Sequence, residues 1–406
     1  MTFQTFVRQN ARWLAGGIGL NFFASFGQTF FISMFAEQYR AEFELSHGGF
    51  GSIYMIGTLS SAITLVFIGK VVDYYSVRNV ASVVIVALSM ACALMASVNS
   101  VLLLVIAIYF LRLAGQGMMS HTAITAMGRW FAAERGRAVA VTSAGHQLGE
   151  AVLPFIVLVL FAKSDWRQVW WICAAALVLF ALPIVRTCFV QDRTPMGSAQ
   201  TALEKGRQWT RREALRDPWF WLTCCGVLAP GFIGTSVWFH HKHLLEIKQW
   251  NASTLVAGFA MMSLVSVAMS LVTGQLIDRF SAYRLLPFIL IPLSLGCLVL
   301  SVATDSHLLL VYMFMVGICY GLYSAIFGAL WSEVYGIRHL GAIRSVVFAC
   351  MVLSSAIGPG LTGWLIDNGA GFEEQLAVMG VVCLFGTLIL FPVSNRLHKH
   401  VVANAT

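Results

Sequence analysis

The chain has 406 residues, of which 58% are hydrophobic and only 11% are charged, and its mean hydropathy is +0.78. An ordinary soluble domain carries roughly 25% charged residues, so this composition excludes a soluble protein with a polar surface. The formal net charge of +8 fits basic loops that face an anionic membrane surface, and it requires no nucleic-acid partner.

Twelve stretches are apolar and long enough to cross a membrane, which takes about 20 residues in a helix. They are too long and too continuous for the alternating strands of a membrane barrel. The sequence therefore predicts an all-α integral membrane protein with twelve transmembrane helices. In chain order the expected spans are 13–36, 48–69, 80–98, 101–129, 138–162, 168–188, 218–241, 253–277, 285–303, 307–331, 345–366 and 375–394.

The loop after the second span, "GKVVDYYSVR" at 69–78, recurs as "GQLIDRFSAYR" at 274–284. An offset of 205 residues relates the two copies, and it also relates Pro154 to Pro359. We infer a duplicated six-helix unit whose copies keep the same orientation, because six spans return the chain to its starting side. The expected domains are 1–188 and 218–406, joined by a polar linker at 189–217.

The fourth and fifth spans carry ionisable side chains near mid-membrane. Arg112 lies about eleven residues into its span and Glu150 about twelve, so at ~1.5 Å per residue their depths coincide. A buried ionisable group is costly unless it is paired or hydrated, so we expect a contact between Arg112 and Glu150, directly or through water. His146 shares the helical face of Glu150, and His121 lies at a similar depth. An ion pair that only orients the two spans is the structural alternative.

The second half has no ionisable residue at the equivalent positions, which are Gly317, Ile326, Met351 and Ser355. The ionisable residues that only the first half carries, Arg112, His146 and Glu150, are therefore the better candidates for anion recognition and proton coupling. The linker patch "EKGRQWTRREALRD" at 204–217 has two interpretations, a plain tether or an amphipathic helix on the inner membrane surface. No cysteine spacing indicates a metal site or a disulfide framework, and neither a metal nor a cofactor is expected.

Lysine and arginine are distributed unequally between the loops of the two sides. With the N-terminus inside, 20 of the 26 fall on the inner side and 5 on the outer side, while Arg112 is left within the membrane. Such a bias predicts that both termini are cytoplasmic.

The repeated Gly-x-x-x-Asp loop resembles the loop between helices 2 and 3 of the major facilitator superfamily, although Ser76 replaces the second glycine of that pattern. "LRLAGQG" at 111–117 and "ERGRA" at 134–138 are similar to further motifs of the family. The resemblance implies two pseudo-symmetric six-helix bundles in a bacterial inner membrane. It implies gating roles, with capping and topology as the structural alternative, for Gly69, Asp73, Arg78, Gly274, Asp278 and Arg279.

In that family helices 1, 4, 7 and 10 line the central cavity. The resemblance therefore adds Asn21, Gln28, Gln116, Trp238, Tyr320 and Tyr323 to Arg112 and His121 as the expected substrate-binding set, with packing as the structural alternative for each added residue.

The predicted function is secondary active transport of a small organic anion, such as a monocarboxylate, by alternating access. Proton coupling through Glu150 and His146 is expected, since no phosphate-binding G-x-x-x-x-G-K-[ST] loop is present for ATP. One alternative is proton-driven efflux of drugs or other amphiphiles. Another is a lipid flippase or a transport-inactive receptor on the same scaffold. No catalytic motif predicts an enzyme, and the expected partners are the solute, protons and lipid, around a monomer.

Overall fold

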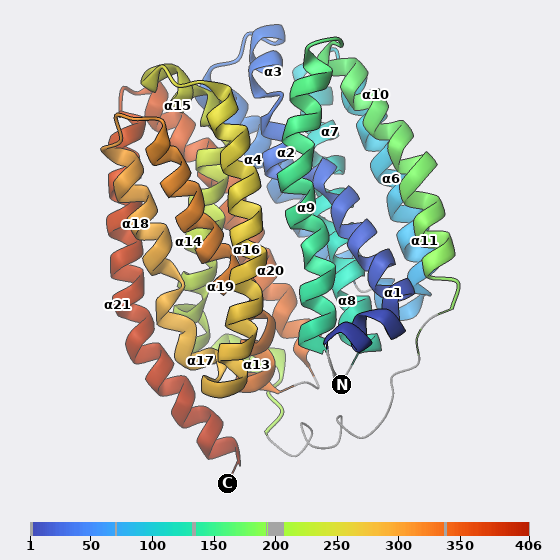
Figure 1. Cartoon of the computed structure of the whole chain (residues 1–406), viewed down its shortest axis with the longest axis vertical. Coiled ribbons are helices and arrows are strands. Elements are labelled where there is room, and N and C mark those ends of the chain that lie inside the picture. The colour runs from blue at the N-terminus through green and yellow to red at the C-terminus, as the bar shows by residue number, and fades with distance from the viewer. Residues whose placement is uncertain are drawn as a thin grey trace. The chain divides into compact units, whose positions relative to one another are not determined.

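The computed structural model describes residues 3–69, 71–131, 135–191, 193, 207–336 and 339–405 (Figure 1). The chain divides into two compact units, Met1–Met196 and Gly197–Thr406. The division falls inside the segment 189–217 that the sequence predicts as the linker. The exact limits of the three predicted regions stay a prediction, and residues 194–206 of the linker lie outside the described residues.

Unit 1 consists of helices, two of which contain a π-helical segment. In chain order its elements are α1 (Phe3–Ala24), the 3-10 helix η1 (Ser25–Gly27), α2 (Thr29–Ser33), α3 (Ala36–Glu42), α4 (His47–Ile68), α5 (Val71–Tyr74), α6 (Val77–Ala96), α7 (Val101–Leu111), the π-helix η2 (Arg112–Met119), α8 (Ser120–Trp130), α9 (Arg135–Phe161), α10 (Trp166–Ala176), the π-helix η3 (Leu177–Ala181) and α11 (Leu182–Cys188).

Unit 2 repeats the helical pattern with fewer interruptions. Its elements are α13 (Arg211–Arg216), α14 (Pro218–Phe239), α15 (His241–Lys248), α16 (Ala252–Phe280), α17 (Ala282–Leu285), the 3-10 helix η4 (Leu286–Phe288), α18 (Leu290–Ser301), α19 (His307–Tyr335), α20 (Leu340–Asp367) and α21 (Phe372–Ala405).

Eleven helices of the described residues are long and apolar enough to cross a membrane, and a twelfth span is obtained if the bent pair Gln4–Ser33 and Ala36–Glu42 counts as one. The two parts of that pair meet at 60°. The predicted fold class, an all-α membrane protein of two six-helix bundles, is confirmed.

Residues with short polar side chains cap the N-termini of several spans. The side chains of Ser46, Ser100 and Asp165 accept hydrogen bonds from backbone N–H groups in the first turns of α4, α7 and α10. These caps satisfy donors that a helix leaves unpaired at its N-terminus.

In both units the first span of the repeat packs closely on the fifth. In unit 1, Gly145 and Gly149 of α9 bring that helix against α1, where a Cβ on Gly145 would lie 2.2 Å from the carbonyl oxygen of Ile18. In unit 2, a Cβ on Gly358 of α20 would lie 2.7 Å from the carbonyl oxygen of Phe232 in α14. Small residues permit such backbone contact in membranes, where apolar burial alone does not drive association.

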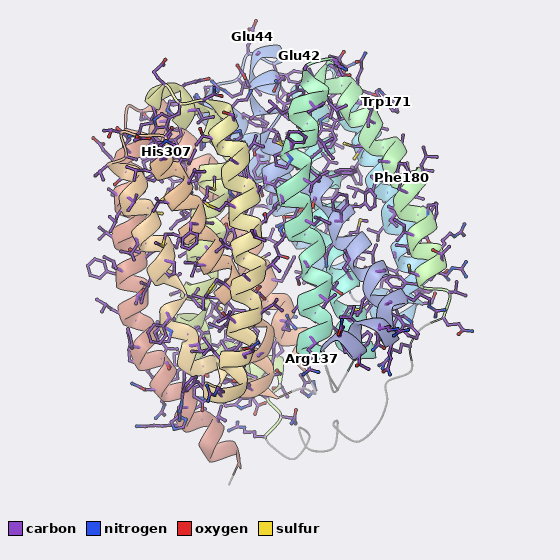
Figure 2. The ribbon with its side chains drawn as sticks, in the orientation of Figure 1. Glu42, Glu44, Arg137, Trp171, Phe180 and His307 are labelled. Carbon is purple, nitrogen blue, oxygen red and sulfur yellow. The ribbon has the colours of Figure 1, made fainter. Side chains whose placement is uncertain are left out.

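In Figure 1, α1 begins and α11 ends at the same end of unit 1. Within unit 2, α13, which precedes the first span, lies at the end of that unit where α21 ends (Figure 1). In unit 1, Figure 2 shows Glu42 and Glu44 at the end opposite to Arg137. Trp171 and Phe180 point outward from the same unit (Figure 2) and are 52% and 60% exposed, as expected of side chains that face lipid.

Candidate functional site

The first span of unit 1 is broken near its middle. α1 ends at Ala24, the 3-10 turn η1 follows, and Gln28 is extended with φ −85° and ψ 156° before α2 begins. Irregular backbone at membrane depth is tolerated only where protein satisfies its polar groups or where it lines a cavity. The break therefore marks a place at which other side chains must supply hydrogen bonds.

A π-helical segment of the fourth span, η2, lies directly against this break. A Cβ on Gly115 would lie 2.7 Å from the Cα of Gly27, and a Cβ on Gly27 would lie 2.1 Å from the carbonyl oxygen of Leu111. Neither glycine can accept a side chain without displacing backbone. π-Helical segments are rare and often occur at functional sites, and here two irregular segments meet.

Arg112, the first residue of η2, joins the first, second and fourth spans. One terminal nitrogen of its guanidinium, Nη1, donates to the carbonyl oxygen of Gly27 at 3.2 Å and to Oγ1 of Thr29 at 3.1 Å. The guanidinium lies 5.4 Å from the ring centroid of Tyr54, whose hydroxyl is 2.6 Å from Oγ1 of Thr29. The arginine is 1% exposed. A cation that stays protonated is thus held at the helix break inside unit 1.

Glu150 and His146 lie together on α9, as predicted. Glu150 is 3% exposed, and its Oε1 is 3.4 Å from Nε2 of His146. The ring of His146 also lies 6.2 Å from that of Phe30. Within the described part of the chain, Oε1 of Glu150 and Nδ1 of His146 have no hydrogen-bond partner. Pro154 has no N–H for the carbonyl of Glu150, so the backbone of this turn is also altered.

The predicted contact between Arg112 and Glu150 stays a prediction. The contacts described above join Arg112 to Gly27, Thr29 and Tyr54, and they join Glu150 to His146. Thr29 and Tyr54 could not be predicted as partners of the arginine, because an uncharged hydroxyl in an apolar span does not stand out in the sequence.

His121 contacts the predicted gating loop. Its Nε2 is 3.1 Å from the carbonyl oxygen of Gly69, the residue that follows α4. Its role in substrate binding stays a prediction. Asn21, another predicted ligand, is 2% exposed and donates through Nδ2 to the carbonyl oxygen of Thr142 on α9 at 3.1 Å. Gln28 lies at the helix break and Gln116 within η2, and both are partly buried.

The two copies of the gating loop differ in backbone conformation. Ser76 is extended and caps α6, whereas Ser281, at the equivalent position, has φ 71° and ψ 151°. Glu333 accepts a hydrogen bond from the N–H of Ala282 at 2.9 Å in the second copy. The backbones of Asp73 and Asp278 lie in α5 and α16, but their side chains are outside the described residues. The gating roles of the six predicted residues, which include Arg78, Gly274 and Arg279, stay predictions.

In unit 2 the structure brings together two of the three predicted aromatic ligands. The rings of Trp238 and Tyr320 are 5.7 Å apart at 72°, and Phe259 lies 6.4 Å from Trp238. Gly234 makes room for this group, since a Cβ there would lie 1.9 Å from the hydroxyl oxygen of Tyr320. Tyr323 packs on Phe327 instead, at 5.0 Å.

No metal centre is indicated among the side chains that the structure describes, where no three His, Cys, Asp or Glu residues group suitably for an ion. The cysteines are free.

Comparison with known proteins gives a family match over nearly the whole chain. The family model of the Major Facilitator Superfamily matches residues 18–303 and 243–405. The oxalate:formate antiporter of Oxalobacter formigenes is 24% identical over 285 residues, which are 68% of this chain and 66% of that protein. The fujikurins efflux protein of Gibberella fujikuroi is 22% identical over 283 residues, which are 68% of this chain and 58% of that protein.

The aligned regions thus cover less than two thirds of each of these relatives, 66% and 58% of their length. Among solved structures, the chain is similar to a bacterial homologue of the human lysosomal transporter Spinster in an inward-facing, unoccupied conformation. The TM-score is 0.70 with 16% identity, and 98% of each chain is covered.

Proposed function

Because the chain belongs to the Major Facilitator Superfamily, it is a membrane transporter, and we propose that it moves a small organic anion, such as a monocarboxylate, by alternating access. The observation that carries this proposal is the burial of Arg112 at the break of the first span. Broken helices near the bilayer midplane form the substrate sites of many secondary transporters.

A guanidinium at such a break favours a carboxylate substrate. Its planar fork of N–H donors matches the two oxygens of a carboxylate, and the attraction is stronger in a site that excludes water. Thr29 and Tyr54 hold the arginine in place through neutral contacts, so its approach to a substrate is preorganised. The relative from Oxalobacter formigenes, whose name gives oxalate and formate as its substrates, supports this substrate class.

We assign proton coupling to Glu150 and His146. A carboxyl and an imidazole in contact within a span can share a proton, and buried groups of this kind mark proton relays in transporters. Loading and release of that proton would couple transport of the anion to a proton gradient as symport. The alternative to symport is exchange of one anion for another across the membrane. Because one relative is an antiporter, the experiment must also measure exchange.

The test is uptake of labelled formate, oxalate, lactate and a cationic dye by proteoliposomes that contain the full chain. In Arg112→Ala, acid uptake should fall at least ~100-fold, the order expected when a charged hydrogen-bonding partner worth about 3 kcal/mol is lost, while the protein still inserts. Arg186→Ala, an exposed arginine at the end of α11, is the matched control. Full acid uptake by Arg112→Ala would refute the anion site.

Glu150→Gln separates the two coupling modes. If Glu150 carries the proton, this variant loses uptake driven by a pH gradient but keeps exchange of labelled for unlabelled acid. Uptake that still follows the pH gradient in Glu150→Gln would remove Glu150 from the mechanism.

Efflux of amphiphiles is the second candidate function. The efflux relative and the aromatic group of Trp238, Phe259 and Tyr320 favour it, since aromatic rings bind flat apolar cations. Efflux would be established if the wild type transports the dye but no acid, and if Trp238→Ala loses the dye transport. Movement of labelled lipid with no water-soluble substrate would instead indicate a flippase, and binding of a ligand that is never transported would indicate a receptor.

We further propose that the protein works as a monomer in a bacterial inner membrane with both termini in the cytoplasm. The excess of lysine and arginine in the inner loops supports this orientation.

A further inference from the structure

The end of the segment that precedes α14 is docked on unit 2. The backbone N–H of Trp209 donates to the carbonyl oxygen of Tyr335 at 3.0 Å. Its indole lies edge-on to the ring of Tyr335 at 5.4 Å and parallel to His400 at 5.8 Å. Ala214 of α13 is 1% exposed. Residues 207–217 are therefore part of the surface of unit 2 rather than a loose tether.

The last helix, α21, contributes to the same surface. Its 34 residues span roughly 50 Å at ~1.5 Å per residue, whereas the hydrocarbon core of a bilayer is ~30 Å thick. The final turns thus project beyond the apolar layer. They are held there by His398, whose Nδ1 is 3.0 Å from the hydroxyl of Tyr283, and by the stacking of His400 on Trp209.

These two elements present a group of exposed basic side chains, which we call the basic platform. Two carboxylates that the structure describes beside them, Glu213 and Asp217, are engaged within the protein. Glu213 accepts hydrogen bonds from the N–H and hydroxyl of Thr210 and contacts Arg207 at 3.2 Å, and Asp217 is 7% exposed beneath the hydroxyl of Tyr335. The platform consists of Arg207, Arg211, Arg212, Arg216, Arg396 and Lys399.

The platform lies where a span enters the membrane. α13 ends at Arg216, and the span α14 begins at Pro218. In the first turn of that span, Trp221 is 46% exposed, and its indole N–H donates to the carbonyl oxygen of Leu215 at 2.9 Å. Half-exposed tryptophans of this kind mark the membrane–water boundary. The arginines of α13 are therefore at the depth of lipid headgroups.

We propose that the basic platform binds the headgroups of anionic phospholipids. Guanidinium groups bind phosphate oxygens through paired N–H donors. Clusters of four to eight basic residues next to a span bind anionic lipid with about 1 kcal/mol per residue, or about five-fold in affinity. The packing of Trp209 between Tyr335 and His400 holds the cluster in a fixed arrangement, so this surface should select anionic over zwitterionic lipid more strongly than dispersed charges do.

The experiment is native mass spectrometry of the full-length protein in neutral detergent, titrated with cardiolipin and, separately, with phosphatidylcholine. The wild type should retain cardiolipin preferentially. The double variant Arg211→Gln/Arg212→Gln should weaken cardiolipin binding about 25-fold, as two losses of about five-fold each, and leave phosphatidylcholine binding unchanged.

Lys163→Gln/Arg186→Gln is the matched control, because it removes two exposed charges from unit 1 and should leave cardiolipin binding unchanged. If the α13 variant melts at a lower temperature than the wild type, Arg396→Gln/Lys399→Gln tests the same platform from α21 and should weaken binding similarly. Equal cardiolipin binding by the wild type and both platform variants would overturn the proposal. So would an equal loss of binding in the unit 1 control.

Discussion

Replacement of Gly115 by alanine tests the contact that positions Arg112. The added Cβ would lie 2.7 Å from the Cα of Gly27, and ordinary contact begins at 3.4 Å, so η2 and the helix break must separate by about 0.7 Å (3.4 − 2.7) to restore ordinary contact. The same separation would lengthen the hydrogen bond from Arg112 to Gly27 from 3.2 Å towards 3.9 Å, beyond hydrogen-bonding range.

Two costs follow from this displacement. Overpacking of a close contact costs about 1–3 kcal/mol, and loss of a hydrogen bond from a charged donor costs about 1.5–3 kcal/mol. Even a loss of about 2.5 kcal/mol lowers the melting temperature of a unit of this size by about 5–10 °C. The assay is thermal unfolding of the purified protein in detergent, together with uptake of the labelled acids.

Gly328→Ala is the matched control for that measurement. Gly328 lies inside α19, and a Cβ there meets nothing within 4 Å, so alanine should be neutral or stabilising by about 0.5–1 kcal/mol. If Gly115→Ala melts at the same temperature as Gly328→Ala, the close approach of the two irregular segments does not hold Arg112, and the reasoning fails.

Two further predictions concern local structure in unit 2. Ser281→Gly should stabilise the protein by about 1 kcal/mol, because φ 71° with ψ 151° is a region that favours glycine and the serine side chain makes no capping hydrogen bond to α17. The control is Ser76→Gly, which removes the cap of α6 and should not stabilise the protein. Thermal unfolding of the two variants compares them. Hydrogen bonds from Thr210 and Arg207 lower the pKa of Glu213 from 4.5 to about 2. The ionised Glu213 should therefore stabilise the docking of α13 fully above pH 4.5, and this stabilisation should be lost as the pH falls towards 2. The fluorescence of Trp209 follows the docking, and an identical pH profile in Glu213→Gln would contradict this prediction.

The architecture could be predicted from the sequence because membrane spans depend on the length and polarity of long stretches. Ten of the twelve expected spans are single helices or helices with a π segment, and the ninth contains the 3-10 turn η4. In the first, the 60° bend lies between Ser33 and Ala36, after the break at 25–28. The break itself was not predicted, since "FFASFGQTFF" at 22–31 contains no proline and no charged residue and is mostly apolar. Only Gly27 signals a close approach there, and glycine is common in membrane helices.

The candidate site was predicted in part. Arg112, His146 and Glu150 stand out because charge is rare within spans, and the contact of His146 with Glu150 follows from helical spacing. The partners of Arg112 could not be predicted, because they depend on a three-dimensional meeting of a carbonyl, a hydroxyl and a ring. The docking of Trp209 was likewise hidden, since one tryptophan in a polar linker fits either a tether or an amphipathic helix.

The most direct test of the anion site at Arg112 is thermal stabilisation of the purified protein by small organic acids. A ligand that binds only the folded protein, at 100 times its dissociation constant, stabilises it by about 2.7 kcal/mol, which is a shift of several degrees. We predict that carboxylates produce this shift in the wild type and in Arg186→Ala but not in Arg112→Ala. An undiminished shift in Arg112→Ala, or a shift with cationic dyes alone, would contradict it.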